Sequence, residues 1–123
     1  MKVIRIEQQA ITKRHQKWLF INEMCKHTKD LYNYANYLIR QEFVQNKKYI
    51  QYKELNFDLK SNELYKFCMS QPANCVLRRL DKNWKSFFKA IKDWKEHKEK
   101  YNAMPKLPKY LKKDGRFVWV IPN

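Results

Sequence analysis

The sequence contains almost no glycine and few acidic residues, and these shortages limit the chemistry that it can support. Gly115 is the only glycine among 123 residues, which excludes the glycine-rich loops that cradle nucleotide phosphates. The 12 Asp and Glu residues are scattered among lysines, whereas metal-dependent phosphodiester cleavage needs carboxylates that converge on an ion. We therefore expect no catalytic residues, and no enzyme activity for this chain alone.

Cysteine is also scarce and follows no metal-binding or disulfide pattern. Cys25, Cys68 and Cys75 are odd in number and include no C-x-x-C pair, which argues against a disulfide framework and against a zinc ribbon. Cys25 and His27 could form half of a metal site, but no spacing supports the other two ligands. We predict no metal and no cofactor. The lack of a disulfide pattern fits a protein of a reducing compartment.

Long hydrophobic runs are missing as well. No stretch approaches the roughly 18 apolar residues of a membrane-spanning helix, and the first 16 residues hold no apolar run of signal-peptide length. We expect a cytoplasmic protein that neither spans a membrane nor is exported.

Positive charge is what the sequence has in excess. The 27 Lys and Arg residues against 12 Asp and Glu give a net charge of +15. This self-repulsion is tolerated most easily when the partner is a polyanion. Nucleic acid is the first candidate partner, an anionic membrane surface the second, and a basic protein without a polyanionic partner is the third interpretation.

The hydrophobic content of 44% is enough for one compact domain. Partial alternation around Val3, Ile4 and Ile6 predicts a strand within residues 1–12. Residues 13–46 have helical periodicity with a possible break near 27–29, so one bent helix or two helices are both acceptable. Two short helices are expected at 53–59 and 62–69.

Ser70 and Pro72 predict the start of a long helix, with Ser70 as its N-cap. Nothing interrupts this helix before about Lys100. Residues 104–123 then read as a basic loop and a strand, RFVWVI. The predicted fold is α+β, mainly α: a helical bundle, residues 13–103, inserted between strands of a small β unit.

The long helix has two faces of opposite character. At 100° per residue, seven large apolar side chains fall on one side and should enter the core: Val76, Leu77, Leu80, Trp84, Phe87, Ile91 and Trp94. The opposite side carries cations without an acid among them: Arg78, Lys82, Lys85, Lys89 and Lys92. The aromatic residues are therefore expected in the core and not as a base-stacking platform.

The cations are candidates for contacts with phosphate. Spacings of three and four residues advance about 5–6 Å per contact, comparable to the phosphate separation along one strand. The following loop adds Lys106, Lys109, Lys112 and Lys113. Because most of these residues are lysines, which are point charges, backbone contact is favoured over base reading. The alternative is a lysine face that only keeps the protein soluble.

Three polar residues near the start of the helix are candidates for reading bases. The amides of Gln71 and Asn74 could pair with adenine, and Tyr52 could stack or donate a hydrogen bond. Each could equally be an ordinary surface or capping residue.

Several motifs together resemble the N-terminal region of the TnpB (OrfB) proteins of insertion sequences. They are a strand followed by a T-x-x-x-Q helix at Thr12, the helix opening SQPA at Ser70, the run LDKNWKSFF at Leu80 and the loop PKYLKK at Pro108. This family consists of RNA-guided DNA endonucleases that are often called transposases and are related to compact type V CRISPR effectors. The resemblance covers nearly the whole chain.

The resemblance implies an oligonucleotide-binding-like wedge, made by residues 1–12 and 104–123, and a helical recognition domain between them. Tyr52, Gln71, Asn74 and Arg78 would then face the DNA that flanks the target. The lysine face would lie near the backbone of guide RNA or of the guide–target heteroduplex. The family's metal-binding acidic triad and zinc ribbon are absent from this sequence, so DNA and guide RNA are the expected partners of a non-catalytic part.

Two further hypotheses remain open. The chain could be a free-standing basic module or regulator that binds DNA or RNA. It could also be a protein-interaction or membrane-surface helical protein that uses the same cationic face.

Overall fold

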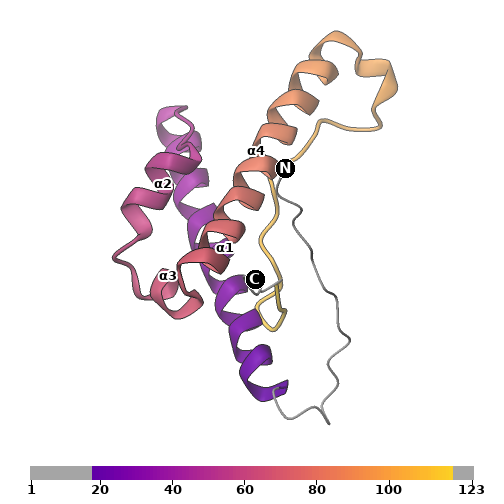
Figure 1. Ribbon diagram of the computed structural model, residues 1–123. Coiled ribbons are helices and arrows are strands. Elements are labelled where there is room, and N and C mark those ends of the chain that lie inside the picture. Colours follow the sequence, from indigo (N-terminus) through magenta and orange to yellow (C-terminus); the bar gives the residue numbers. More distant parts are fainter. Residues whose placement is uncertain (1–17, 118–123) are drawn as a thin grey trace, which may run out of the picture.

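Four α-helices and a returning extended segment make up the computed structural model, which describes residues 18–117. The helices are α1 (Trp18–Asn46), α2 (Tyr52–Leu59), α3 (Glu63–Cys68) and α4 (Ser70–Glu96), and a short 3-10 turn, η1 (Lys98–Lys100), follows. The chain then turns back as an extended segment, residues 101–117, which we call the returning segment (Figure 1).

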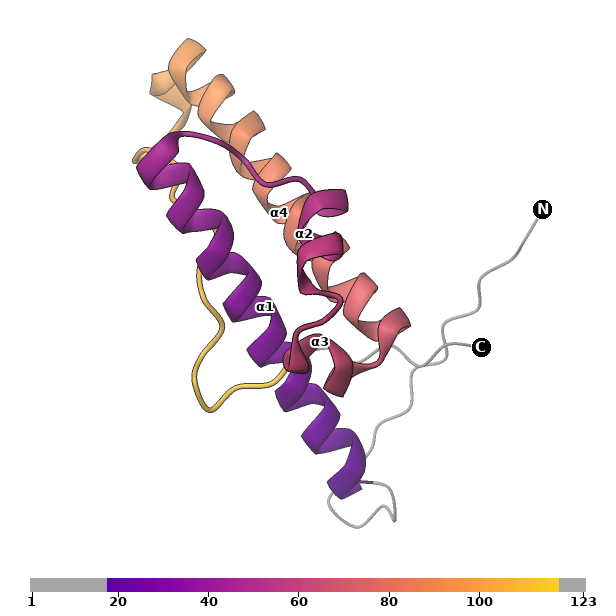
Figure 2. The ribbon, with the colours of Figure 1, turned by 90° about the vertical axis from the view of Figure 1, so that its left-hand side faces the viewer.

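The two long helices, α1 and α4, pack side by side and run in the same direction (Figures 1 and 2). Their side chains meet in the same order along both helices, as three pairs show: Tyr32 with Asn83, Asn36 with Trp84, and Phe43 with Phe87. The connection through α2 and α3 covers one side of this pair, and α4 extends beyond the end of α1 (Figure 1).

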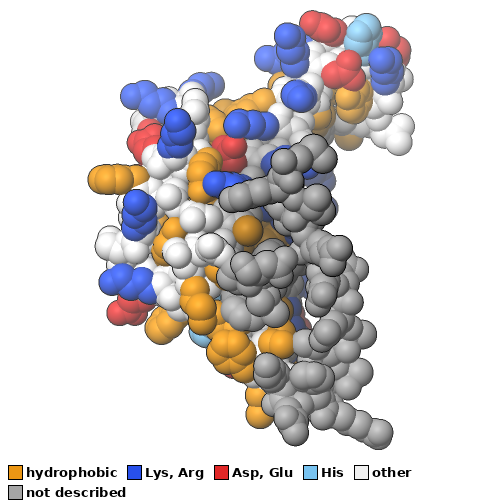
Figure 3. Space-filling view, viewed as in Figure 1, with side chains coloured by type: hydrophobic (Ala, Val, Ile, Leu, Met, Phe, Trp, Pro, Cys, Tyr) orange, Lys and Arg blue, Asp and Glu red, His pale blue; other side chains and the backbone are white. Residues whose placement is uncertain are grey.

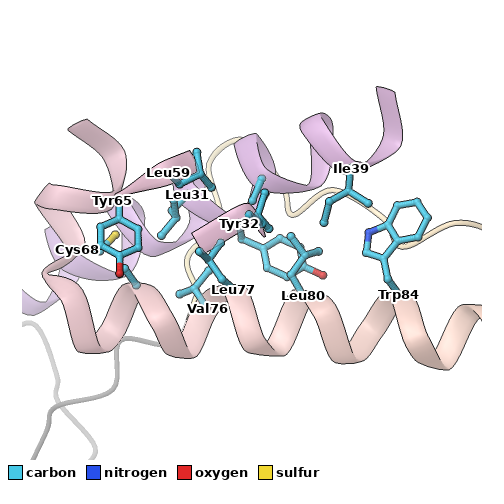
Figure 4. Close-up of a cluster of buried hydrophobic side chains, with 13 residues drawn as sticks. Leu31, Tyr32, Ile39, Leu59, Tyr65, Cys68, Val76, Leu77, Leu80 and Trp84 are labelled. Carbon is cyan, nitrogen blue, oxygen red and sulfur yellow. The ribbon is translucent and has the colours of Figure 1, made fainter. Parts of the chain in front are cut away.

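The core lies between α1 and α4 and is closed by α2 and α3 (Figure 4). Leu31 and Ile39 of α1, and Leu77, Leu80 and Trp84 of α4, are fully buried. Burial of each such side chain is worth about 1.5–3 kcal/mol before conformational entropy is subtracted. Aromatic rings of α1, the following loop and α4 extend the core: Phe43, Tyr49, Phe87 and Phe88 surround Trp84.

Local signals explain where the short helices begin and end. The side chain of Asn62 accepts a hydrogen bond from the Leu64 N–H, which caps α3. Met69, with a φ of 67°, separates α3 from α4. The predicted helices at 53–59 and 62–69 are thus confirmed within a residue or two. The N-cap of α4 is Met69, however, and the prediction of Ser70 was wrong by one position.

The returning segment runs antiparallel to α1 and is held by side chains on one face of that helix. Asn33 exchanges two hydrogen bonds with the backbone of Leu111, at 2.8 and 3.0 Å. Further along, the Lys29 Nζ donates to the Lys113 carbonyl at 2.7 Å, and the Phe117 N–H donates to the Cys25 carbonyl at 3.0 Å. These contacts join parts of the chain that lie 78 to 92 residues apart in the sequence.

The predicted α+β fold class is wrong for the described residues. Helices make up 73% of them, and residues 18–117 contain no strand and no sheet. Instead of forming a strand ladder, residues 104–117 bond to side chains of α1, so no oligonucleotide-binding-like β unit is present in this part. The strand predicted within residues 1–12 and the end of RFVWVI lie outside the described residues.

Two expectations about the long helices also need correction. The break considered near residues 27–29 does not occur, because α1 is continuous from Trp18 to Asn46. Val76, Leu77, Leu80 and Trp84 are buried as expected, but Ile91 and Trp94 are only half-buried and lie outside the core cluster. The reason is that α4 continues past the end of α1, where no other helix of residues 18–117 covers its apolar side (Figure 1).

Candidate nucleic-acid interface

The cations predicted on α4 form one exposed row. Arg78, Lys82, Lys85, Lys89 and Lys92 are all exposed, and we refer to them as the α4 cationic row. They point away from the core because Leu77, Leu80 and Trp84 hold the opposite face of α4 against α1. The burial of the apolar face therefore orients the row towards solvent.

The row has little acidic compensation. Within residues 18–117, Lys85 is its only member with a carboxylate partner, an ion pair with Asp81 at 2.9 Å. Arg78, Lys82, Lys89 and Lys92 make no ion pair with the described residues. The Lys85 end of this pair is 63% exposed, which weakens the pair. Since the other four cations of the row have no such partner, most of the positive charge is available to an anionic ligand.

Asp81, the partner of Lys85, is nearly buried and also contacts the loop after α1. Its carboxylate accepts a hydrogen bond from the Tyr49 hydroxyl. Burial, then this hydrogen bond and the negative charge of Asp81, raise the pKa of Tyr49 above its ordinary range. The phenol therefore stays protonated and joins the loop after α1 to the middle of α4.

Three of the four predicted DNA-facing residues come together where α2 meets α4. The Tyr52 hydroxyl donates to Asn74 Oδ1 at 2.9 Å, and the guanidinium of Arg78 lies over the Tyr52 ring, 5.3 Å from its centroid. The Tyr65 hydroxyl also lies 3.2 Å from Asn74 Oδ1. Gln71 is exposed on the first turn of α4.

This geometry limits what Asn74 can do. Bidentate pairing with adenine needs both the oxygen and the nitrogen of the amide, and the Asn74 oxygen already faces two tyrosine hydroxyls. The amide nitrogen, with its two N–H groups, remains as a donor only. Reading of bases by Tyr52, Gln71 and Asn74 stays a prediction, and in the structure Tyr52 and Asn74 join α2 to α4.

A shallow hollow of about 280 Å³ lies beside this cluster. It is lined by three cations, one acid and two neutral polar residues: Lys53, Arg78, Lys85, Asp81, Gln51 and Tyr52. Lys53 did not emerge from the sequence, because α2 is short and only its position next to Tyr52 could have pointed to it. In the space-filling view, Lys and Arg side chains are frequent over α2 and α4, and hydrophobic ones gather lower on the same face (Figure 3).

The loop lysines are exposed but lie in two places. Lys106 and Lys109 line a groove against α4. Lys112 and Lys113 follow Leu111, in the part of the returning segment that is bound to α1 through Asn33 and Lys29. The structure therefore brings only the first two of these four lysines beside α4.

Within residues 18–117, no three His, Cys, Asp or Glu side chains are grouped so that they could hold a metal ion. No helix in the same part of the chain is long and apolar enough to cross a membrane.

Comparisons with protein-family models, with curated proteins and with solved structures find no match to this chain.

Proposed function

We propose that this chain is a nucleic-acid-binding protein that contacts the sugar–phosphate backbone through the α4 cationic row. The observation that carries the proposal is that Arg78, Lys82, Lys89 and Lys92 are exposed on one helix face without a carboxylate partner among residues 18–117. Partners that supply a regular series of negative charges match this face best, because each lysine can neutralise one phosphate.

Backbone contact is favoured over base reading by the chemistry of the row. Four of its five members are lysines, which bind phosphate as point charges and do not form the bidentate fork that recognises guanine. The fifth, Arg78, is engaged with the ring of Tyr52. Binding should therefore depend weakly on base sequence.

The more specific form of the proposal follows the resemblance to TnpB-type proteins. In this form the chain is the non-catalytic N-terminal part of an RNA-guided DNA endonuclease, and its partners are guide RNA and target-flanking DNA. The helical recognition domain is retained in this proposal, whereas the β wedge is not. Sequencing the DNA beyond the Asn123 codon tests it: an acidic triad followed by C-x-x-C pairs supports the nuclease, and an immediate stop in several relatives supports a free-standing module.

Charge reversal tests the general form of the proposal. Lys82→Glu combined with Lys89→Glu reverses two unpaired cations of the row and should weaken binding to a labelled RNA or DNA by at least about tenfold, because about two phosphate contacts are lost. Fluorescence anisotropy at fixed salt measures this change.

The matched control changes the same net charge elsewhere. Lys60→Glu combined with Lys66→Glu alters two exposed lysines, one directly after α2 and one within α3, and should weaken binding about twofold or less. Equal losses in the two double variants would show that only net charge matters, and the α4 cationic row would then not be the interface. Stronger binding to anionic vesicles than to nucleic acid would favour the membrane-surface alternative.

A further inference from the structure

A groove of about 340 Å³ separates α4 from the returning segment. Residues from 83 to 90 of α4 form one wall and residues 105–109 of the returning segment form the other, with Tyr32 of α1 also in the lining. Its volume is at the lower end of the range of about 300–1,000 Å³ for small-ligand pockets. The groove can therefore take one planar group of moderate size, not a whole helix or peptide.

The walls of the groove are largely apolar. Phe87 and Ala90 contribute from α4, and Pro105 and Pro108 from the returning segment. Phe87 is held in place by its edge-on contacts with Trp84 and Phe43. An aromatic ring and two proline rings on facing walls suit a flat, π-rich ligand such as a nucleobase.

The groove also offers hydrogen-bonding groups that the fold does not use. The Asn83 Nδ2 donates to the Tyr32 hydroxyl at 2.9 Å. Among residues 18–117, no donor is bonded to Asn83 Oδ1 and no acceptor is bonded to the Tyr32 hydroxyl hydrogen. Together with the hydroxyl of Ser86, the groove thus presents both an acceptor and donors, which is the combination that the Watson–Crick edge of an unpaired base requires.

Cations flank the groove on both sides. Lys106 and Lys109 belong to its lining on the returning segment. On α4, Lys82 and Lys89 lie four residues before and three residues after Ser86, so they are its neighbours on the helix surface. A strand that crosses the groove would meet positive charge before and after the base-sized space.

We propose that this groove binds one unpaired nucleotide of a single-stranded nucleic acid, with its base between Phe87 and the two prolines and its phosphates at Lys82, Lys89, Lys106 and Lys109. The inference rests on the proposed function and adds the substrate class, because a paired base within a duplex cannot enter. RNA and DNA share the base and phosphate chemistry that the groove recognises.

Filling the groove tests this inference. Ser86 is exposed, so Ser86→Trp should leave the core intact and occupy the space of the base. We expect wild type to bind a single-stranded 12-mer of RNA or DNA at least about tenfold more tightly than the matched duplex, since stacking of one base contributes a factor of this size. Ser86→Trp should remove most of that preference. Anisotropy titrations with three probes, the RNA 12-mer, the DNA 12-mer and the duplex, measure the preference.

Ser61→Trp makes the same change at an exposed position between α2 and α3 and should preserve the preference. As a second variant, Lys106→Gln combined with Lys109→Gln should weaken single-strand binding more than duplex binding without filling the groove. Equal binding of single strand and duplex, or an unaltered preference in both groove variants, would overturn the inference and leave phosphate binding by the row intact. Failure of wild type to bind any of the three probes would instead refute the proposed function itself.

Discussion

At the scale of single residues, Asn36 joins three parts of the molecule. It is fully buried; its Oδ1 accepts a hydrogen bond from Trp84 Nε1 at 2.9 Å, and its Nδ2 donates to the Pro108 carbonyl at 3.1 Å. One amide thus satisfies a buried indole of α4 and a carbonyl of the returning segment. Burying such groups without partners costs about 1–3 kcal/mol each.

Replacing Asn36 should therefore destabilise the fold strongly. We expect Asn36→Ala to lower the free energy of unfolding by about 3 kcal/mol, because the Trp84 N–H and the Pro108 carbonyl both lose their partner. Urea denaturation followed by circular dichroism measures this. Asn46→Ala, at the exposed end of α1, is the control and should change stability by less than about 0.5 kcal/mol; similar values for the two variants would contradict the role of Asn36.

The pairing of Tyr49 with Asp81 makes a second prediction at this scale, on alkaline stability. Because the folded-state pKa of Tyr49 lies above its ordinary value of about 10, its contribution to stability is complete below pH 10 and is lost as the pH rises further. Tyr49→Phe should be less stable than wild type by about 1 kcal/mol at pH 8. This difference should shrink above pH 10.

Urea unfolding of both proteins between pH 8 and 11 measures the difference. Tyr37→Phe is the control, because Tyr37 is exposed on α1 and its loss should have little effect at any pH. A difference between wild type and Tyr49→Phe that stays constant up to pH 11 would show that the phenol ionises as it does in water.

At the scale of elements, the returning segment is held by asparagine side chains of α1 that bond to its backbone. Asn33 offers Leu111 one acceptor and one donor, as a neighbouring strand would, at 2.8 and 3.0 Å. This arrangement satisfies the backbone of an extended segment without a sheet. It also places Lys106 and Lys109 against α4.

Removing the Asn33 amide should release this segment. We expect Asn33→Ala to speed native-state cleavage by trypsin after Lys106 and Lys109 by about tenfold, because two hydrogen bonds that hold the segment are lost. Mass spectrometry follows the cleavage rates at a trypsin concentration low enough that a released segment rebinds to α1 faster than it is cleaved. An unchanged rate, relative to the Asn46→Ala control, would show that the segment is held by other contacts.

The helices could be predicted from the sequence far better than their surroundings. The start of the long helix, the two short helices and the two faces of α4 follow from local signals and from periodicity, which act within a few residues. The position of residues 104–117 depends on Lys29, Asn33 and Asn36, which lie 72 to 84 residues away. No local signal carries such information, and alternating apolar residues near the C-terminus favoured a strand.

The same distinction holds for the candidate site. The α4 cationic row was predicted because helical geometry alone sets which side chains share a face. The engagement of Asn74 and Arg78 with Tyr52 and the groove beside Ser86 required knowledge of how α2 and the returning segment pack. Residue type alone therefore could not show that Tyr52, Asn74 and Arg78 also join α2 to α4.

At the scale of the whole molecule, a net charge of +15 on 123 residues is the property that the proposed function explains. Among residues 18–117, three of the ion pairs engage a lysine or a histidine outside the α4 cationic row, so the charge of the row is scarcely neutralised within the fold. Binding of a polyanion would relieve this repulsion and release counterions.

The salt dependence of nucleic-acid binding by the wild-type chain tests this claim most directly. With about six phosphate contacts, the plot of log K against log salt should have a slope of about −5, so that affinity falls about 10³-fold between 50 and 200 mM salt. Anisotropy titrations with one labelled DNA duplex across this range measure the slope. A slope near zero would contradict phosphate binding by the α4 cationic row.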